Sequence, residues 1–259
     1  MTINRIFVLA KNVFQEVVRD RILFIIGFYA LIIAIAFRVL PEFAAATEDK
    51  IFLDFGLAAM NAMGLIVAIF IGTGLVNKEI EKRTILVLIA KPVSRSEIIV
   101  GKYLGLSAVI AVLIATMTAI YLLFLQIGNI YHSATSILIA AIFLFLQLSL
   151  ITAVAITFGV FTASLLATVL TFAVYLIGNI TQDLVQLGRL SRNPGMERLT
   201  QGLFLILPDL SRLNLKNDAI YGLQALPDTT ALITNAAYGL LYSAMLLAIA
   251  IFIFSQREF

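Results

Sequence analysis

The stretch that decides the fold is TSILIAAIFLFLQLSLITAVAITFGVFTASLLATVLTFAVYLIGNI, residues 135–180, which contains no Asp, Glu, Lys or Arg. A membrane-spanning helix needs about 20 predominantly apolar residues. The stretch is therefore long enough to cross a bilayer twice, as 135–158 and 162–180. Because Gly159 lies in an uncharged run between them, we expect either a tight antiparallel pair of helices or one long broken segment.

The whole chain shares this apolar character. Of its 259 residues, 61% are hydrophobic and 13% are charged, whereas soluble domains average about 45–50% apolar and about 25% charged. A soluble domain of this size cannot bury so much apolar surface. The composition argues against a soluble enzyme, a disordered chain and a fibrous repeat, and it predicts an all-α integral membrane protein.

Four further stretches have the length and hydropathy of spanning helices: 22–40, 55–76, 103–126 and 230–254. The chain is thus expected to form a single transmembrane domain, 1–259, with six spans. All five prolines lie outside these six ranges. Because proline kinks a helix, its absence predicts continuous spans and argues against the broken-helix ion sites of many secondary transporters.

Orientation follows from the positions of Lys and Arg, which are enriched in cytoplasmic loops. The segment before the first span holds four of them, the loop 77–102 holds six and the tail after the last span holds one, against six on the opposite side. Both termini are therefore predicted to be cytoplasmic.

The segment before the first span, 1–21, repeats apolar residues at helical spacing and carries polar and basic residues on its other face. This pattern predicts an amphipathic helix lying in the membrane interface. Its function is either plain anchoring or a mechanical connection between a cytoplasmic partner and the first span.

The cytoplasmic loop 77–102, NKEIEKRTILVLIAKPVSRSEIIVGK, is the most informative connection. Its apolar run 84–90 is too short to span and suits a short helix on the membrane surface or under a partner. Ser94 and Glu97 form the S-x-x-E capping box that starts a helix. Gly101 and Gly105 form a G-x-x-x-G pattern, which permits close helix approach. We expect a structured docking surface; the alternative is a solvated connector.

The outer segment 181–229 contains no full span. Helical patterns with apolar faces cover 183–190 and 196–207 and are followed by PDLSRLN, 208–214. Short helices lying on, or dipping into, the outer leaflet are expected. They either pack against the spans or form a lid.

Residues for chemistry are scarce. The chain has no Cys, a single His and no P-loop motif, so we expect no metal site, no bound cofactor and no enzymatic activity. A net charge of +3 gives little support for a nucleic-acid partner. No Asp, Glu or Lys lies at the centre of a span, as a proton-coupled carrier would need. Most uncharged polar residues in the spans are expected to hydrogen-bond between helices: Asn61, Thr116, Thr118, Gln126, Gln147, Thr152, Thr157, Thr171, Asn179 and Asn235.

Three motifs in the loop carry a family resemblance: E-x-E-x-x-T at 79–84, K-P-V-S-R at 91–95 and G-K at 101–102. They resemble the membrane subunits of ABC-2 type ABC transporters, especially the group related to the nitrous-oxide-reductase-associated copper permease. The six spans, the amphipathic start, PDLSRLN and the C-terminal REF extend the resemblance over nearly the whole chain. Relatives often have P-N-L where this chain has Asp209.

The resemblance implies an exporter permease subunit of the bacterial plasma (inner) membrane. Two copies would pair, with a homodimer favoured over a heterodimer, among membrane lipid. Each copy would dock on a separate ABC ATPase that binds ATP and Mg. The loop between the second and third spans would be the coupling helix, and the resemblance assigns to coupling Glu79, Glu81, Arg83, Thr84, Pro92, Ser94, Arg95, Gly101 and Lys102. It implies no particular substrate.

Two other functions stay open from the residues alone. A passive or ion-coupled carrier or channel would transport without an ATPase. A membrane scaffold or assembly factor would bind a partner through the loop without ATP-dependent transport.

Overall fold

The computed structural model describes residues 3–43, 48–81, 94–191 and 194–256. Within these ranges the side chains are described as well, except those of residues 20–21, 41–43, 48, 76–81 and 194. Among the described residues there is no strand. The elements, in order, are α1 Ile3–Val17, the π-helical turn η1 Val18–Ile22, α2 Leu23–Phe43, α3 Glu48–Glu81, α5 Arg95–Ile127, α6 Ala134–Phe161, α7 Ser164–Asn179, α8 Thr181–Leu190, α9 Pro194–Ile206, η2 Leu210–Leu213, α10 Lys216–Ile220, η3 Leu223–Ala225 and α11 Thr229–Gln256.

Five of these helices, α2, α3, α5, α6 and α11, are long and apolar enough to cross a membrane. They confirm five of the six spans expected from the sequence. Helices α3 and α5 also extend beyond those spans, α3 starting at Glu48 and α5 at Arg95.

The fifth expected span, 162–180, differs from the prediction. Helix α7 has 16 residues, about 24 Å at 1.5 Å per residue, which is shorter than the roughly 30 Å hydrocarbon layer. The chain then bends by 61° into α8, so the structure has five spans, or six if this bent pair counts as one. The expectation of continuous spans is wrong here. The break follows Gly178 and Asn179 rather than a proline, and both are poor helix formers.

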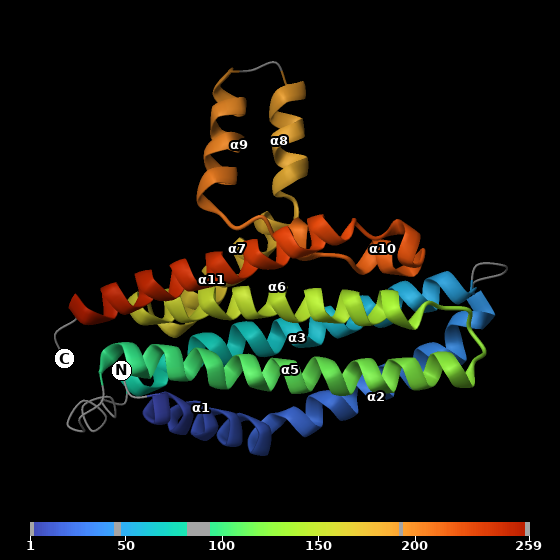
Figure 1. The fold of residues 1–259 in the computed structure, drawn as a ribbon, viewed down its shortest axis with the longest axis horizontal. Coiled ribbons are helices and arrows are strands. Elements are labelled where there is room, and N and C mark those ends of the chain that lie inside the picture. Colours follow the sequence, from blue (N-terminus) through green and yellow to red (C-terminus); the bar gives the residue numbers. More distant parts are fainter. Residues whose placement is uncertain (1–2, 44–47, 82–93, 192–193, 257–259) are drawn as a thin grey trace.

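Helix α6 lies at the centre of the bundle (Figure 1), packed against α3, α5, α7 and α11. It is the most buried of the five spans. It carries no charged residue, so it can be enclosed on nearly all sides without an uncompensated charge. A turn of two residues, 162–163, connects it to α7, and the two helices pack against each other, which agrees with the first of the two expected arrangements, the antiparallel pair.

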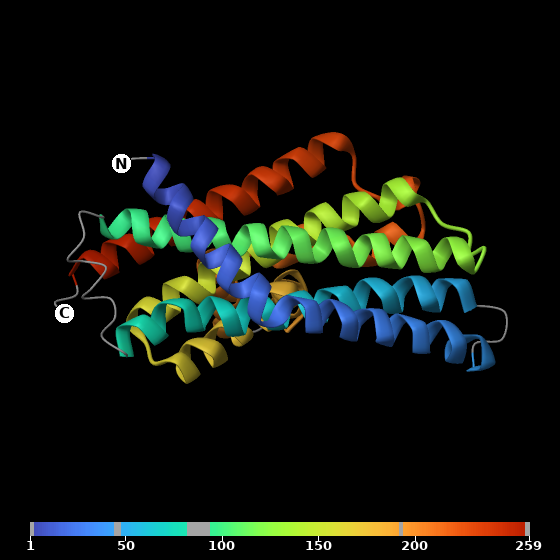
Figure 2. The same cartoon turned by 90° about the horizontal axis from the view of Figure 1, so that it is seen from below.

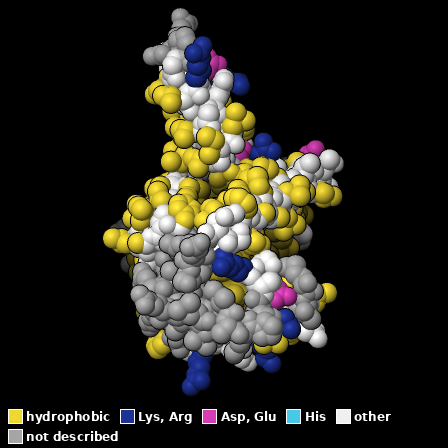
Figure 3. All heavy atoms as spheres, turned by 90° about the vertical axis from the view of Figure 1, so that its left-hand side faces the viewer, with side chains coloured by type: hydrophobic (Ala, Val, Ile, Leu, Met, Phe, Trp, Pro, Cys, Tyr) yellow, Lys and Arg dark blue, Asp and Glu magenta, His cyan; other side chains and the backbone are white. Residues whose placement is uncertain are grey.

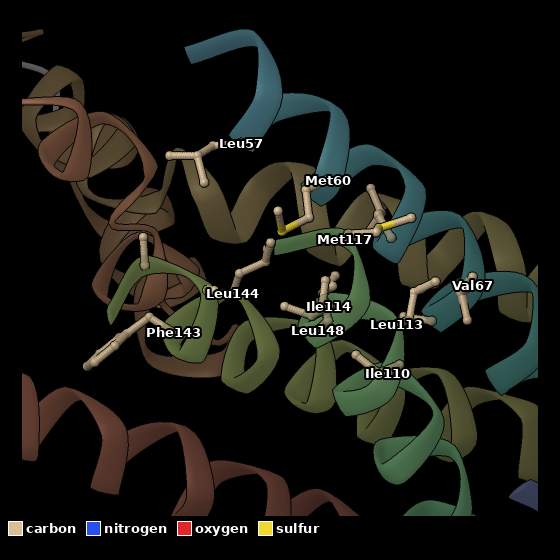
Figure 4. Packing of buried hydrophobic residues seen from close by; sticks show 14 of the residues in the cluster. Leu57, Met60, Val67, Ile110, Leu113, Ile114, Met117, Phe143, Leu144 and Leu148 are labelled. Carbon is tan, nitrogen blue, oxygen red and sulfur yellow. The ribbon is translucent and has the colours of Figure 1, made fainter. Parts of the chain in front are cut away.

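The main core forms where α3, α5 and α6 meet (Figure 4). Met60, Met117 and Leu148 are among its fully buried side chains. Helix α3 reaches α6 through glycines. A Cβ atom at Gly72 would lie 2.9 Å from the Ala155 Cβ, and one at Gly64 would lie 2.4 Å from the Leu148 Cδ1. In a membrane, such small residues permit the close packing that holds helices together.

The substitution Gly72→Leu tests this contact. Because the neighbouring Ala155 Cβ is fixed to its own backbone, the added side chain must push α3 away from α6. We expect a loss of about 1–3 kcal/mol of stability, as for other overpacked cores, measured by thermal unfolding in mild detergent. Gly27→Leu is the control, since a Cβ at Gly27 has nothing within 4 Å. Equal unfolding temperatures for the two variants would contradict the packing.

Candidate coupling site at the start of α5

Nine residues were predicted to couple the chain to an ATPase, and the structure describes four of them fully. Arg83, Thr84 and Pro92 lie outside the described residues, as does the expected coupling helix over 84–90. Glu79 and Glu81 lie in the last turn of α3, but their side chains are outside the described set. Their role in coupling stays a prediction. The remaining four are Ser94, Arg95, Gly101 and Lys102.

Ser94 is the N-cap of α5, as predicted. Its hydroxyl oxygen accepts a hydrogen bond from the Glu97 backbone N–H at 3.2 Å, and its own N–H donates to Glu97 Oε2 at 2.9 Å. This reciprocal pair is a complete capping box, which satisfies N–H groups that the helix leaves without partners. Helix α5 therefore has a defined starting point immediately after the loop.

Arg95 connects this start to the end of α11. Its Nη1 donates hydrogen bonds to the backbone oxygens of Phe254 at 2.8 Å and Ser255 at 2.6 Å. The last carbonyls of a helix have no intrahelical partners, and a cation there also interacts favourably with the helix dipole. The two ends are thus held together across about 160 residues of sequence.

Lys102 connects α5 to α3 through a hydrogen bond to a backbone oxygen within α3. Its Nζ donates to the Leu75 backbone oxygen at 2.7 Å, and the residue is only 4% exposed. A buried ammonium group is stable only when it is hydrogen-bonded.

Gly101 and Gly105 face α1, which crosses α5 at this end of the bundle (Figure 2). A Cβ at Gly101 would lie 2.7 Å from the Leu9 Cβ, and one at Gly105 would lie 2.6 Å from the Ala10 backbone oxygen. The G-x-x-x-G pattern therefore marks a real helix contact. The amphipathic helix expected over 1–21 is present as α1 and η1, which cover Ile3–Val17 and Val18–Ile22. Its place in the membrane interface stays a prediction.

The first three turns of α5 thus contact α1, α3 and α11 together. Figure 3 looks onto this end of the bundle and shows Lys and Arg side chains around it. A displacement of the α5 start would be transmitted to three other helices. The contacts to α11 and α3 are hydrogen bonds from charged side chains, and the contact to α1 is close packing of helix backbones at the two glycines.

A second polar cluster lies inside the bundle, where α7 breaks. The Asn179 Oδ1 accepts hydrogen bonds from Gln147 Nε2 at 3.0 Å and Asn214 Nδ2 at 3.2 Å. One turn earlier, the Tyr175 hydroxyl accepts from Asn61 Nδ2 at 2.7 Å. Three of the polar residues expected to bond between helices therefore do so. Tyr175 was not singled out from the sequence, where it is one of eight tyrosines.

Most threonines of that expected set behave differently. The hydroxyls of Thr116, Thr152 and Thr171 donate to the carbonyl four residues earlier in their own helix. Thr118 and Thr157 do so as well, although Thr118 also reaches Met60 Sδ and Thr157 the Leu246 oxygen of α11. The prediction of interhelical bonds was wrong for the first three, because a helical Thr can always reach its own i−4 carbonyl.

The PDLSRLN motif folds over α7 and α11 around Asp209. This carboxylate, 2% exposed, accepts from Gln182 Nε2 and Arg212 Nε, each at 3.0 Å, and from the Ser211 hydroxyl. The Asp209 backbone N–H donates to the Tyr238 hydroxyl at 2.8 Å. These bonds pair the buried charge and anchor the segment 181–229 to the spans. No group of three or more His, Cys, Asp or Glu that could hold a metal occurs in the described part of the chain.

The family model for "ABC-2 family transporter protein" matches residues 7–259, nearly the whole chain. The chain belongs to the ABC-2 transporter family. It is an integral, multi-pass membrane component of an ABC transporter. The search of curated proteins finds no match. The narrower resemblance to the nitrous-oxide-reductase-associated group stays a prediction.

Within this ABC-2 family protein, Arg95→Ala removes both hydrogen bonds to the end of α11. Because Arg95 is partly exposed, we expect a local loss of about 1 kcal/mol, which corresponds to about fivefold faster amide hydrogen exchange in the last turn of α11. Arg198→Ala, on an exposed position of α9, is the control. Unchanged exchange in α11 would contradict the role assigned to Arg95.

Asn179→Ala removes the oxygen that Gln147 and Asn214 share. Both donors would then lose this partner, and Gln147 is fully buried, so we expect a loss of about 1–2 kcal/mol and an unfolding temperature lower by several degrees, at about 2–4 °C per kcal/mol. Thermal unfolding in detergent measures this change. Asn235→Ala, at a partly exposed position of α11, is the control and should leave the temperature nearly unchanged.

Proposed function

We propose that this chain is the membrane-spanning permease subunit of an ATP-driven ABC exporter in the bacterial inner membrane, with both termini in the cytoplasm. Two copies, in a homodimer, form the translocation path. A separate P-loop ATPase binds ATP and Mg and docks on the loop 77–102. The family match supports the permease assignment, and the contacts of the α5 start support the place of coupling.

The observation that carries the proposal is the arrangement at the start of α5. The charged loop leads directly into the Ser94 cap, so α5 is the first described helix after the proposed docking loop. A push on the loop would move the start of α5. The hydrogen bonds of Arg95 and Lys102 and the two glycine contacts would carry that movement to α11, α3 and α1.

ATP binding and hydrolysis on the partner would supply the energy. Closure of two ATPase subunits would shift both loops, and the attached helices would change which side of the membrane the path opens to. Such a change requires elements with two discrete arrangements. The α7–α8 segment is bent and leaves the bundle part-way along the length of the bundle. The permease can rearrange there without breaking a continuous helix.

Affinity purification of the tagged chain in mild detergent tests the partnership, and we expect a P-loop ATPase to co-purify. The triple charge reversal Glu79→Lys, Glu81→Lys and Arg83→Glu should reduce the co-purified ATPase by about tenfold or more, which corresponds to about 1.4 kcal/mol of lost affinity. The triple variant should still insert into the membrane.

The matched control reverses three charges at the other end of the bundle, with Asp49→Lys, Lys50→Glu and Asp218→Lys. It should retain the ATPase and its ATP hydrolysis. If the wild-type chain purifies without an ATPase, and the triple variant retains its ATP-dependent transport unchanged, the proposed function is overturned.

A further inference from the structure

The PDLSRLN motif lies at the level of the middle of the spans. A Cβ at Gly178 would lie 2.7 Å from the Pro208 backbone oxygen, and the Asn214 amide donates to Asn179. Asn179 is also bonded to Gln147, which lies 13 residues after the start of α6 and 14 before its end. At this level the α8–α9 hairpin leaves the bundle and projects across it rather than along it (Figure 1). The middle of an uncharged span lies in the hydrocarbon layer, so the motif is at membrane depth although it forms no span.

The motif carries a charged pair at this depth. The Arg212 Nε donates to Asp209 Oδ2 at 3.0 Å, and the arginine side chain is 41% exposed whereas the carboxylate is almost fully buried. Ionisable residues inside a membrane are rare and costly, and they commonly mark a binding site or a transport path. Asp209 is satisfied within the protein by its other hydrogen bonds. The exposed arginine is therefore the member of the pair that is available to a ligand.

The guanidinium of Arg212 is held in a fixed orientation. Its Nε edge is bonded to Asp209, and its Cζ lies 5.0 Å from the centroid of the Tyr238 ring. Tyr238 is fixed in turn, because its hydroxyl accepts a hydrogen bond from the Asp209 backbone N–H. Neither Nη atom of Arg212 has a hydrogen-bond partner in the described part of the chain. The two free Nη groups form the planar fork that binds a phosphate or a carboxylate through two parallel hydrogen bonds.

A strip of exposed apolar side chains begins next to this fork. The rings of Tyr238 and Tyr242 lie 5.7 Å apart, and the Tyr242 hydroxyl donates to the backbone oxygen of Ile206. Ile206 itself is 74% exposed. Residues three and seven positions after Tyr238 share its face of α11; they are Leu241 and Met245, both exposed. A ligand bound to the fork would thus have apolar protein surface along the adjoining part of α11.

We propose that Arg212 binds the anionic group, a phosphate or a carboxylate, of an amphiphile whose apolar chain lies along Leu241, Tyr242 and Met245. The fork selects a negative charge, because an uncharged lipid would leave the guanidinium without a partner in hydrocarbon. The apolar strip selects a molecule with a chain, because a small hydrated anion would lose its water at this depth. The amphiphile is either a phospholipid of the bilayer or a molecule that the permease moves. Binding needs a bilayer but no ATPase, so it goes beyond the proposed function.

The chain has no tryptophan, so one introduced tryptophan reports on this site alone. Leu241→Trp places it one turn beyond Tyr238 at an exposed position. The full chain is reconstituted in vesicles of digalactosyldiacylglycerol, a lipid that is uncharged and has no phosphate. Phosphatidylglycerol with brominated chains, which quench tryptophan on contact, should quench at a mole fraction several-fold lower than brominated diacylglycerol. Ile142→Trp, at an exposed position in a groove between α5 and α6, is the matched control and should be quenched equally by both lipids.

Substitutions in the Leu241→Trp background test the role of the charge. Asp209→Asn combined with Arg212→Gln removes both charges, leaves neither unpaired and should abolish the preference for phosphatidylglycerol. Asp209→Asn alone should retain the preference, because the guanidinium remains. Arg212→Lys keeps the charge but not the fork and should retain only part of it. Arg198→Gln, at an exposed position of α9, should leave it unchanged.

Equal quenching of the Leu241→Trp chain by the two lipids would overturn the inference, as would a preference that survives in the double variant. Absence of quenching by either lipid would assign this surface to a second copy or to another protein. Quenching by aqueous iodide alone would assign it to water. Both of these results also overturn the inference.

Two further measurements identify the source of the ligand and separate this site from the proposed function. With the co-purified ATPase present, ATP-dependent movement of labelled phosphatidylglycerol between leaflets, lost in the double variant, would identify cargo. Retained preference without such movement would identify a resident lipid of the bilayer. If no ATPase co-purifies while the preference is retained, the proposed function fails and the Arg212 site stands.

Discussion

Hydrocarbon offers no hydrogen-bond partner to a peptide group, and the rest of this structure depends on that constraint. Every backbone N–H and C=O that crosses the membrane must be satisfied within its own segment, which is why the described residues form helices and no strand. The charge-free α6 can then sit at the centre, with α3, α5, α7 and α11 around it. Close packing replaces the hydrophobic driving force that lipid removes, and glycines such as Gly72 allow it.

The same constraint explains where the polar side chains are found. Several of them lie where a helix ends or breaks and its backbone groups lose their partners, and others, such as Asn61 with Tyr175 and Ser107 with Ser149, join helices along their length. Arg95 binds the last carbonyls of α11, and Ser94 caps the first turn of α5. Asn179 receives two amide donors where α7 gives way to α8. The polar sites of this permease are therefore joints between helices, which is where a transporter needs adjustable contacts.

The two joints lie at different levels of the bundle and share helix α6 as a neighbour. At the start of α5, Ile99 packs with Val160 of α6 and Phe254 of α11. At the break of α7, Gln147 at the middle of α6 bonds Asn179. Helix α6 is rigid and buried, and it contacts both joints. It therefore connects the end of the bundle where an ATPase would dock with the level at which the chain bends from α7 into α8. Coupling between distant sites needs such a contiguous, packed path.

The sequence by itself determined the helical class, five of the spans, the capping box at Ser94 and the close approach at Gly101 and Gly105. Each of these is local: it depends on hydropathy over about 20 residues or on side chains within one turn of helix. The tertiary structure decided where α7 breaks, which amides meet at Asn179, that Arg95 binds the end of α11, and that the hairpin leaves at the middle of α6. These features join residues up to about 160 positions apart. Local patterns contain no information on such pairs, because only the packing of the helices against one another brings the partners together.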